Sequence, residues 1–139
     1  MKTLLAIIEK AGGWRPSLYL KIPNPPYMEL VIEAMDESGP LGLPTLSFCH
    51  YGEQRGDLMR DSEMCFEIVC AEDGTLSLNA WYFRNDYFAR EQWSRNIVSG
   101  QYVCIPSIHE DQQDFAQSWD NNLRMQGFLE AFTDQCIRG

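Results

Sequence analysis

The densest group of polar side chains lies between His50 and Asp61, in the tract HYGEQRGDLMRD. A histidine followed by Glu53, Asp57 and Asp61 has the residue types of a general base or of a metal site. The spacing matches no metalloenzyme or hydrolase motif, so the tract supplies candidate residues but no reaction. A solvated connection between two strands, with one aspartate in a turn, is the simpler interpretation.

A second polar group, Arg84-Asn85-Asp86, follows the aromatic run Trp81-Tyr82-Phe83. Asn and Asp are frequent in turns, so a turn is again the simpler interpretation. Neither group is assigned a catalytic or a metal-binding role. The candidate binding residues are His50, Tyr51, Glu53, Asp57, Arg60, Asp61, Trp81, Arg84 and Asp86.

The common catalytic signatures do not occur in this sequence. It contains no G-x-S-x-G, P-loop, dinucleotide fingerprint, H-E-x-x-H or C-x-x-C. The second histidine, His109, precedes Glu110 and Asp111, where a role at a helix N-terminus is more typical than catalysis. We therefore expect no cofactor and lean away from an enzyme.

Composition favours one soluble globular domain over residues 1–139, with 45% hydrophobic and 22% charged residues. The formal net charge is −9, from 20 acidic and 11 basic side chains. The arginines are scattered among carboxylates, so a phosphate backbone would be repelled and nucleic acid is an unlikely partner. A basic protein, or a protein surface that normally holds nucleic acid, suits this charge better.

The cysteines indicate a reducing compartment. There are five of them, an odd number, and their spacing fits no zinc site. Cys65, Cys70 and Cys136 stand among apolar residues, which predicts reduced thiols in the core. The apolar run 4–8 is too short for a signal peptide or a membrane span, so we expect a cytoplasmic protein with no membrane partner.

Periodicity divides the chain into two end helices and a central set of strands. Residues 4–11 repeat at helical spacing, and residues 111–137 do so again with a kink expected at Gly127. Asp73-Gly74 marks a hairpin, Asn85-Asp86 marks a turn, and residues 94–108 show no period. Loops are expected at 36–44 and 52–56, and strands at 17–22, 27–35, 45–51, 64–70, 76–83 and, over a short helix, 87–93.

These elements predict an α+β fold. An antiparallel meander of five or six strands would be covered on one face by a short N-terminal helix and a long C-terminal helix. The other face would be more aromatic than a merely hydrated surface requires. Its expected residues are Tyr19, Val31, Cys49, Tyr51, Val69, Trp81 and Phe83.

Four segments carry a family resemblance: residues 16–22, 24–28, 50–61 and 83–87. They resemble a small bacterial family of unknown function that is found with phage and plasmid genes, and the likeness covers most of the chain. The C-terminal residues Asn122, Phe128-Leu129, Phe132, Cys136 and Gly139 are similar to the ending of another uncharacterised bacterial family. Neither family has an established activity, so the resemblance implies no catalytic residues. It implies an accessory protein of a mobile element that binds host machinery.

Three functional hypotheses follow. The first is a non-enzymatic protein-binding accessory protein of a mobile element, which inhibits a host defence or regulatory complex. The second is a small-ligand or metal-dependent enzyme that uses the tract from His50 to Asp61. The third is a structural subunit of a larger assembly. The sequence leaves open the oligomeric state and whether the two polar groups form one site.

Overall fold

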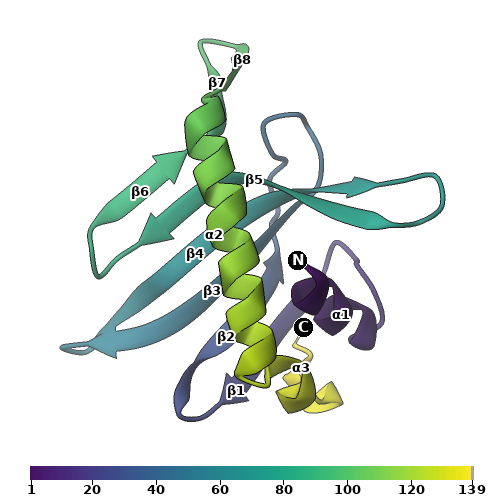
Figure 1. Ribbon diagram of the computed structural model, residues 1–139, viewed down its shortest axis with the longest axis vertical. Helices are drawn as coiled ribbons and strands as arrows, with labels where there is room; N and C mark the ends of the chain where they lie inside the picture. The colour runs from purple at the N-terminus through teal and green to yellow at the C-terminus, as the bar shows by residue number, and fades with distance from the viewer. Residues whose placement is uncertain (139) are drawn as a thin grey trace.

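The computed structural model describes residues 1–138 and has the α+β arrangement that the sequence predicts (Figure 1). Six antiparallel strands pair in chain order, so the main sheet is a meander, and two further strands form a second sheet. The six strands are β1 (Tyr19–Asn24), β2 (Tyr27–Ala34), β3 (Thr45–Gln54), β4 (Asp57–Cys70), β5 (Leu76–Asn85) and β6 (Arg90–Trp93).

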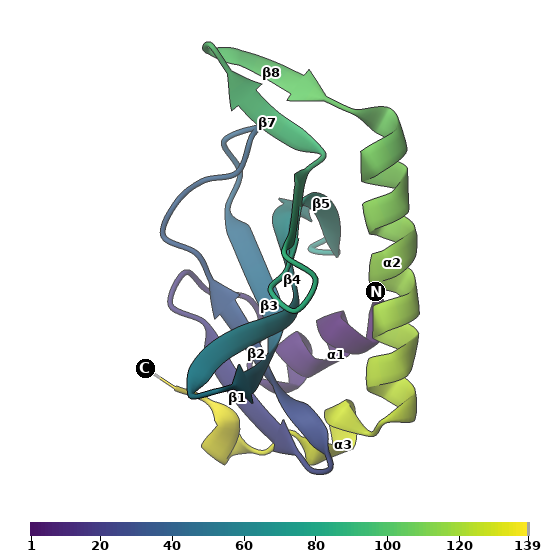
Figure 2. The ribbon, with the colours of Figure 1, turned by 90° about the vertical axis from the view of Figure 1, so that its left-hand side faces the viewer.

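The helices lie on one side of the main sheet, as the nearly edge-on view of Figure 2 shows. They are α1 (Lys2–Lys10), α2 (Pro106–Met125) and α3 (Phe128–Ala131), while the short 3-10 helix η1 (Asp134–Cys136) lies at the β1 edge of the sheet. Helix α2 runs the length of this layer, and α1 packs beside it. We call the covered side the helix face and the opposite side the outer face.

Helix α2 begins earlier and ends sooner than the sequence analysis expects. It starts at Pro106, a residue favoured at the first position of a helix because its fixed φ suits helical geometry. The predicted kink at Gly127 is wrong: this glycine has φ 81°, which ends α2, and α3 starts at the next residue.

The core lies between the helices and the apolar row of each strand. Phe48 of β3 stacks on Phe66 of β4 at 5.2 Å between ring centroids and meets Trp119 of α2 at 4.2 Å. Buried Asp120 of α2 accepts hydrogen bonds from the backbone N–H groups of Thr3 (3.0 Å) and Leu4 (2.8 Å). It therefore satisfies donors in the first turn of α1 and joins the two ends of the chain.

The predicted connection at 52–56 is instead a long hairpin. Strand β3 continues to Gln54, and β4 restarts at Asp57. Arg55 (φ 52°) and Gly56 (φ 83°) form the two-residue turn, and two positive φ angles are typical of a type I′ turn. This prediction is wrong because the extension is polar on both sides and lacks the alternation that reveals a half-buried strand.

A bulge in β5 corrects the expected set of outer-face residues. Cys65 pairs with Tyr82 but Phe66 pairs with Ala80, so Trp81 is the extra residue. Beyond it the alternation is shifted, and Phe83 packs on Phe115 of α2 at 5.3 Å, on the helix face. Tyr82 therefore replaces Phe83 on the outer face.

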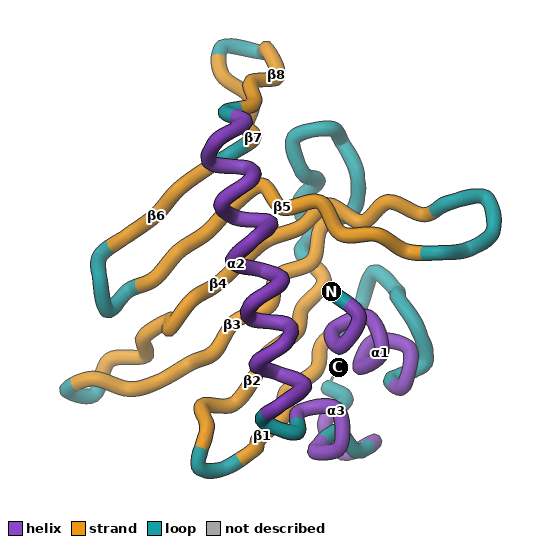
Figure 3. Tube along the Cα trace, viewed as in Figure 1, coloured by secondary structure: helices purple, strands orange, loops and turns teal. Residues whose placement is uncertain are grey.

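The segment without a period contains the second sheet, which the sequence analysis missed. Strands β7 (Arg95–Val98) and β8 (Gln101–Cys104) form a hairpin that projects past the first turn of α2 (Figure 3). Arg95 is buried at its base, where its Nη1 lies 2.6 Å from Oε1 of buried Glu67. The other oxygen of Glu67 accepts the N–H groups of Leu41 and Leu43, so this ion pair ties the loop 36–44 to the sheet.

The five cysteines are free thiols, but they do not all lie in the core. Cys49, Cys65 and Cys136 are buried, whereas Cys70 and Cys104 are exposed, so the prediction for Cys70 is wrong. Cys70 is the last residue of β4, at the end of the strand that extends beyond the helices (Figure 1). Among residues 1–138, no helix is both long and apolar enough to cross a membrane.

Candidate functional site

The structure divides the candidate residues among three places. Tyr51, Arg60, Arg84 and Asp86 lie on the outer face with Trp81 beside them, so part of the 50–61 tract does meet the second polar group. His50 and Asp61 line a hollow on the helix face. Glu53 and Asp57 lie at the tip of the β3–β4 hairpin, next to its turn.

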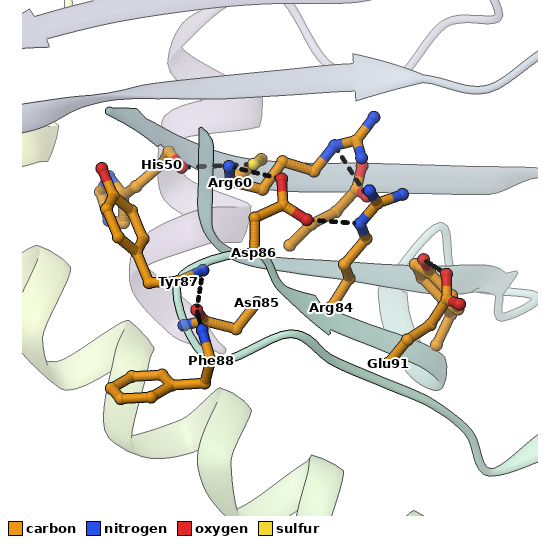
Figure 4. A network of polar contacts seen from close by, with 11 residues as sticks. His50, Arg60, Arg84, Asn85, Asp86, Tyr87, Phe88 and Glu91 are labelled. Atoms are coloured by element: carbon orange, nitrogen blue, oxygen red, sulfur yellow. Dashed lines mark hydrogen bonds and ion pairs between the residues drawn. The ribbon is translucent and has the colours of Figure 1, made fainter. Parts of the chain in front are cut away.

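Asp86 is the centre of the contact between the two groups (Figure 4). Its Oδ2 accepts the backbone N–H of Arg60 at 2.9 Å, and its Oδ1 accepts Nε–H of Arg84 at 2.7 Å. Burial raises the pKa of Asp86, but these hydrogen bonds and the two positive charges outweigh it and lower the pKa below its usual value. The ionised carboxylate thus fixes Arg84 relative to Arg60.

Asn85 fixes the turn beneath this contact. Its Oδ1 accepts the backbone N–H groups of Tyr87 (3.0 Å) and Phe88 (3.2 Å), and its Nδ2 donates to Asp61 Oδ1 at 3.2 Å (Figure 4). These are bonds typical of an Asx turn, and they connect β5 to the bulged part of β4. Asp86 is therefore held by both its own bonds and those of its neighbour.

Carboxylates gather beside the arginines on the outer face. Glu63 lies 3.5 Å from Nε of Arg60 and accepts the hydroxyl of Ser47 at 2.8 Å. Burial, then the charges of Glu63 and Asp36, raise the pKa of Glu33. A hollow of about 480 Å³ separates these groups, and it is lined by Glu33, Ala34, Met35, Asp36, Glu37, Ser47 and Glu63.

Next to the carboxylates, three aromatic side chains line a second hollow of about 330 Å³. The Tyr82 ring lies 5.8 Å from Trp81 and 5.2 Å from Trp93, and its hydroxyl donates to Glu91. Trp93 is 41% exposed. The indole N–H of Trp81 is buried, yet it meets no acceptor within residues 1–138. We call this feature, with Arg60, Glu63 and Arg84 at its rim, the aromatic hollow.

His50 has a structural role that the sequence did not indicate. The indole N–H of Trp119 donates to its Nε2 at 2.9 Å, and its Nδ1 lies 3.1 Å from the carbonyl oxygen of Met28. Because an indole can only donate and a carbonyl can only accept, His50 is neutral with its proton on Nδ1. Burial lowers the pKa of His50, in agreement with this state. Both ring nitrogens are occupied, so His50 is a poor general base or metal ligand.

The hollow beside His50 measures about 310 Å³ and lies under α2. Its walls include the Tyr27, Phe115 and Trp119 rings, with the Asp61 carboxylate on one side. In the part of the chain that the structure describes, no three His, Cys, Asp or Glu side chains come close enough to hold a metal ion. The metal site considered for the tract therefore has no support from its geometry.

Three members of the aromatic hollow, Glu63, Tyr82 and Trp93, are absent from the candidates named from the sequence, as is Glu91, which accepts the Tyr82 hydroxyl. Tyr82 lies in a run that was correctly predicted as a strand, so only its face was unknown, whereas Glu63 precedes the strand expected at 64–70. Two bulges, at Trp81 and at the Asp61-Ser62 step of β4, shift the alternation and decide that face. Ser62 has φ 66°. The sequence does not predict this conformation, because a positive φ is typical of glycine.

Comparison with known proteins identifies a family but no activity. A model of a domain of unknown function, DUF6908, matches residues 2–129. No curated protein and no solved structure matches the chain. The expected resemblance to an uncharacterised family is confirmed, while nothing connects it with phage or plasmid genes. The chain belongs to the DUF6908 family of domains of unknown function.

Proposed function

We propose that the chain is a non-enzymatic protein-binding module whose outer sheet face receives a basic surface of another protein. The aromatic hollow carries this proposal, because it places the exposed Trp93 beside Tyr82 and Trp81 on the sheet face opposite the helices. Trp, Tyr and Arg are enriched where binding energy concentrates in protein interfaces.

The charges beside the aromatic hollow indicate the charge of the partner surface that it would bind. Arg60 and Arg84 already face Glu63 and Asp86, at 3.5 and 2.7 Å. The carboxylates of Glu33, Asp36 and Glu37 have no ion-pair partner among the described residues. Lysine or arginine side chains of a partner would pair with these carboxylates and lie against the indole rings. The net charge of −9 would steer such a partner toward the chain.

The aromatic hollow is also held in place before binding. Asp86 fixes Arg84, Glu91 accepts the Tyr82 hydroxyl, and Ser47 and Arg60 hold Glu63. Side chains that are already ordered lose less conformational entropy when a partner binds. This arrangement supports a binding surface more directly than it supports a reacting group.

An accessory role in a mobile element is the finer form of this proposal, and it rests on the resemblance alone. A small acidic protein of that kind would act in the cytoplasm by occupying a host surface meant for nucleic acid. The free cysteines agree with a reducing compartment. The genes that lie beside members of the family are the test, because a random mixture of chromosomal neighbours would remove this part of the proposal.

Affinity purification from the native host tests the proposed function. We expect the tagged chain to retain a stoichiometric partner with a basic surface, and Trp93→Ala to lose it while remaining folded. Phe88→Ala is the matched control, because Phe88 is an aromatic residue 81% exposed on the neighbouring turn. Equal recovery with both variants would place the contact elsewhere. No stoichiometric partner across several growth conditions would reject the module.

A small-ligand function of the hollow under α2 is the second candidate. Its volume of about 310 Å³ and its mixture of aromatic walls with one carboxylate are typical of small-molecule sites. A thermal-shift screen of cationic metabolites would detect such a ligand, and Asp61→Asn should abolish the shift. If no compound stabilises the chain, or if the substitution leaves the shift unchanged, this candidate fails.

A further inference from the structure

The β7–β8 hairpin exposes apolar side chains that the fold itself does not use. Ile97, Val98, Tyr102 and Val103 are between 40% and 53% exposed, and Ile105 at its base is 43% exposed. They occupy both sides of a two-stranded sheet that stands beyond the end of α2 (Figures 1 and 2). Contiguous exposed apolar side chains of this kind mark an interaction surface.

The hairpin is rigidly anchored despite this exposure. At its base, Arg95 pairs with Glu67 and donates to the carbonyl oxygens of Ala80 and Asn79, each at 3.0 Å. The N–H of Ile105 donates to the carbonyl oxygen of Ser94 at 2.8 Å and closes the base. A buried arginine with three backbone or carboxylate contacts fixes the direction in which the hairpin projects.

The hairpin is also uncharged in a strongly acidic chain. From Asn96 to Ile108 there is no Asp, Glu, Lys, Arg or His, although the whole chain has a net charge of −9. Exposed strand edges are usually protected from pairing by lysine, proline or another charged residue. Neither strand has this protection, so the hairpin retains an edge that can pair with another strand.

The geometry indicates which edge is open. Ser99 (φ 53°) and Gly100 (φ 78°) form a two-residue turn. The backbone N–H and C=O groups of the pair next to this turn, Val98 and Gln101, therefore point toward each other across the hairpin. The following pair, Ile97 and Tyr102, then directs its backbone N–H and C=O groups outward. The N–H of Ile97 donates to the side chain of Asn96 at 2.9 Å, which leaves the edge of β8 at Tyr102 as the open one.

We propose that β8 pairs antiparallel with β8 of a second copy, with Tyr102 opposite Tyr102, to form a four-stranded sheet in a two-fold symmetric dimer. Each Tyr102 N–H would donate to the Tyr102 carbonyl of the other copy, as a self-complementary contact requires. A second copy fits this edge because the outward N–H and C=O of Tyr102 are complementary to the same groups of another Tyr102. The hairpin is uncharged and projects along the longest axis, so it keeps the two acidic bodies apart and limits their repulsion (Figure 1).

This contact is small, so the dimer should be weak and dependent on concentration. Interfaces below roughly 1,200 Å² of total buried area are typical of transient complexes. Sedimentation equilibrium of the purified chain should show a shift from 16.0 kDa to twice that mass as concentration rises through the micromolar to millimolar range. A mass of one chain throughout that range overturns the proposal.

Substitutions test the register of the pairing. Tyr102→Pro removes the outward N–H and Tyr102→Lys places a charge at the two-fold axis, so both should abolish the mass shift. Val98→Lys is the matched control on the other strand and should retain most of it. Circular dichroism would verify that each variant is folded, and an unchanged dimer with both Tyr102 variants overturns the proposal.

Disulfide trapping gives an independent readout. In a chain with Cys70→Ser and Cys104→Ser, which removes the two exposed thiols, Tyr102→Cys should form a covalent dimer on mild oxidation. Opposed residues in a hydrogen-bonded antiparallel pair lie about 5.5 Å apart at Cα, within the range that a disulfide spans. Val98→Cys in the same background should remain monomeric, and equal trapping of both would contradict this register. Partner binding on the outer face is a separate measurement, so either proposal can fail alone.

Discussion

The two faces of the main sheet use polar groups for opposite purposes. On the helix face, buried Trp119 donates its indole N–H to partly buried His50, and this hydrogen bond attaches α2 to β3. On the outer face, Asp86 holds Arg84 where it stays partly exposed, and the nearby Trp93 side chain is 41% exposed. Polar groups that complete their hydrogen bonds inside the protein stabilise the fold, whereas ordered side chains that remain exposed are available to a partner.

The comparison also explains why the histidine was a poor guide. Its residue type and its place in a polar tract suggest chemistry, but its parity on β3 turns it toward Trp119 of α2. Tyr51, the next residue on β3, faces outward, where burial raises its pKa to about 12. One step along a strand therefore separates a structural residue from a surface residue.

The largest expected effect tests the buried ion pair between Glu67 and Arg95. Glu67→Ala leaves the charge of Arg95 buried without a partner and releases the N–H groups of Leu41 and Leu43. We expect a loss of about 3–5 kcal/mol in the free energy of unfolding by urea. Exposed Glu72→Ala should change it by less than about 0.5 kcal/mol. If Glu67→Ala lowered the free energy of unfolding by no more than Glu72→Ala does, the ion pair would not be what holds the loop 36–44 on the sheet.

A smaller effect separates the two faces directly. Trp119→Phe removes the donor to His50 Nε2 and leaves that buried acceptor unpaired, which should cost about 1–3 kcal/mol in the same urea measurement. Trp93→Phe, on the outer face, should cost less than about 0.5 kcal/mol because Trp93 is 41% exposed. Similar losses for the two substitutions would remove the distinction between a structural and a binding face.

The pH dependence of stability isolates His50. Its pKa in the folded chain is lowered from 6.5, so below that pH the unfolded chain takes up a proton that the folded chain refuses. Stability should therefore fall as pH decreases from 6.5 toward 5, by at most about 1.4 kcal/mol per pH unit from this group. Burial also lowers the pKa of His109, which adds a slope of the same sign.

His50→Gln checks this assignment, because it removes the titrating ring and should flatten the slope between pH 5 and 6.5. His109→Gln should remove only the second contribution. If the slope of the His50 variant equals that of the unchanged chain, His50 is not held neutral by Trp119 and the helix-face account is wrong.

The sequence was sufficient for the fold class because most of the sheet alternates cleanly. Residues 27–35 and 45–51 bury one side against the helices, and that burial is visible as period two. The hairpin extension at 52–63 and the β7–β8 hairpin were missed, since residues 53–58 and 96–104 are exposed on both sides and neither segment has a single apolar face. The sequence also did not predict the ion pair between Arg95 and Glu67, because nothing in the order of residues indicates that these two side chains meet.

The candidate site was predicted in part. Arg60, Arg84, Asp86 and Trp81 do converge, because the pairing of β4 with β5 brings the two polar groups together. Glu53 and Asp57 do not join them, since the turn between these residues carries them to the tip. Both outcomes depend on the register of strand pairing. The register depends in turn on bulges, which no single residue type predicts.

Site-specific photo-crosslinking tests the central claim most directly. A benzophenone amino acid replaces Trp93 on the outer face in one sample and exposed Asn121 of α2 in the other, and each is irradiated in lysate of the native host. The account predicts one dominant adduct, with a basic protein, from position 93 and none from position 121, and Glu37→Lys, which reverses a charge at the aromatic hollow, should weaken it severalfold. Adducts that form equally at both positions, or only at position 121, would contradict a binding surface on the outer face.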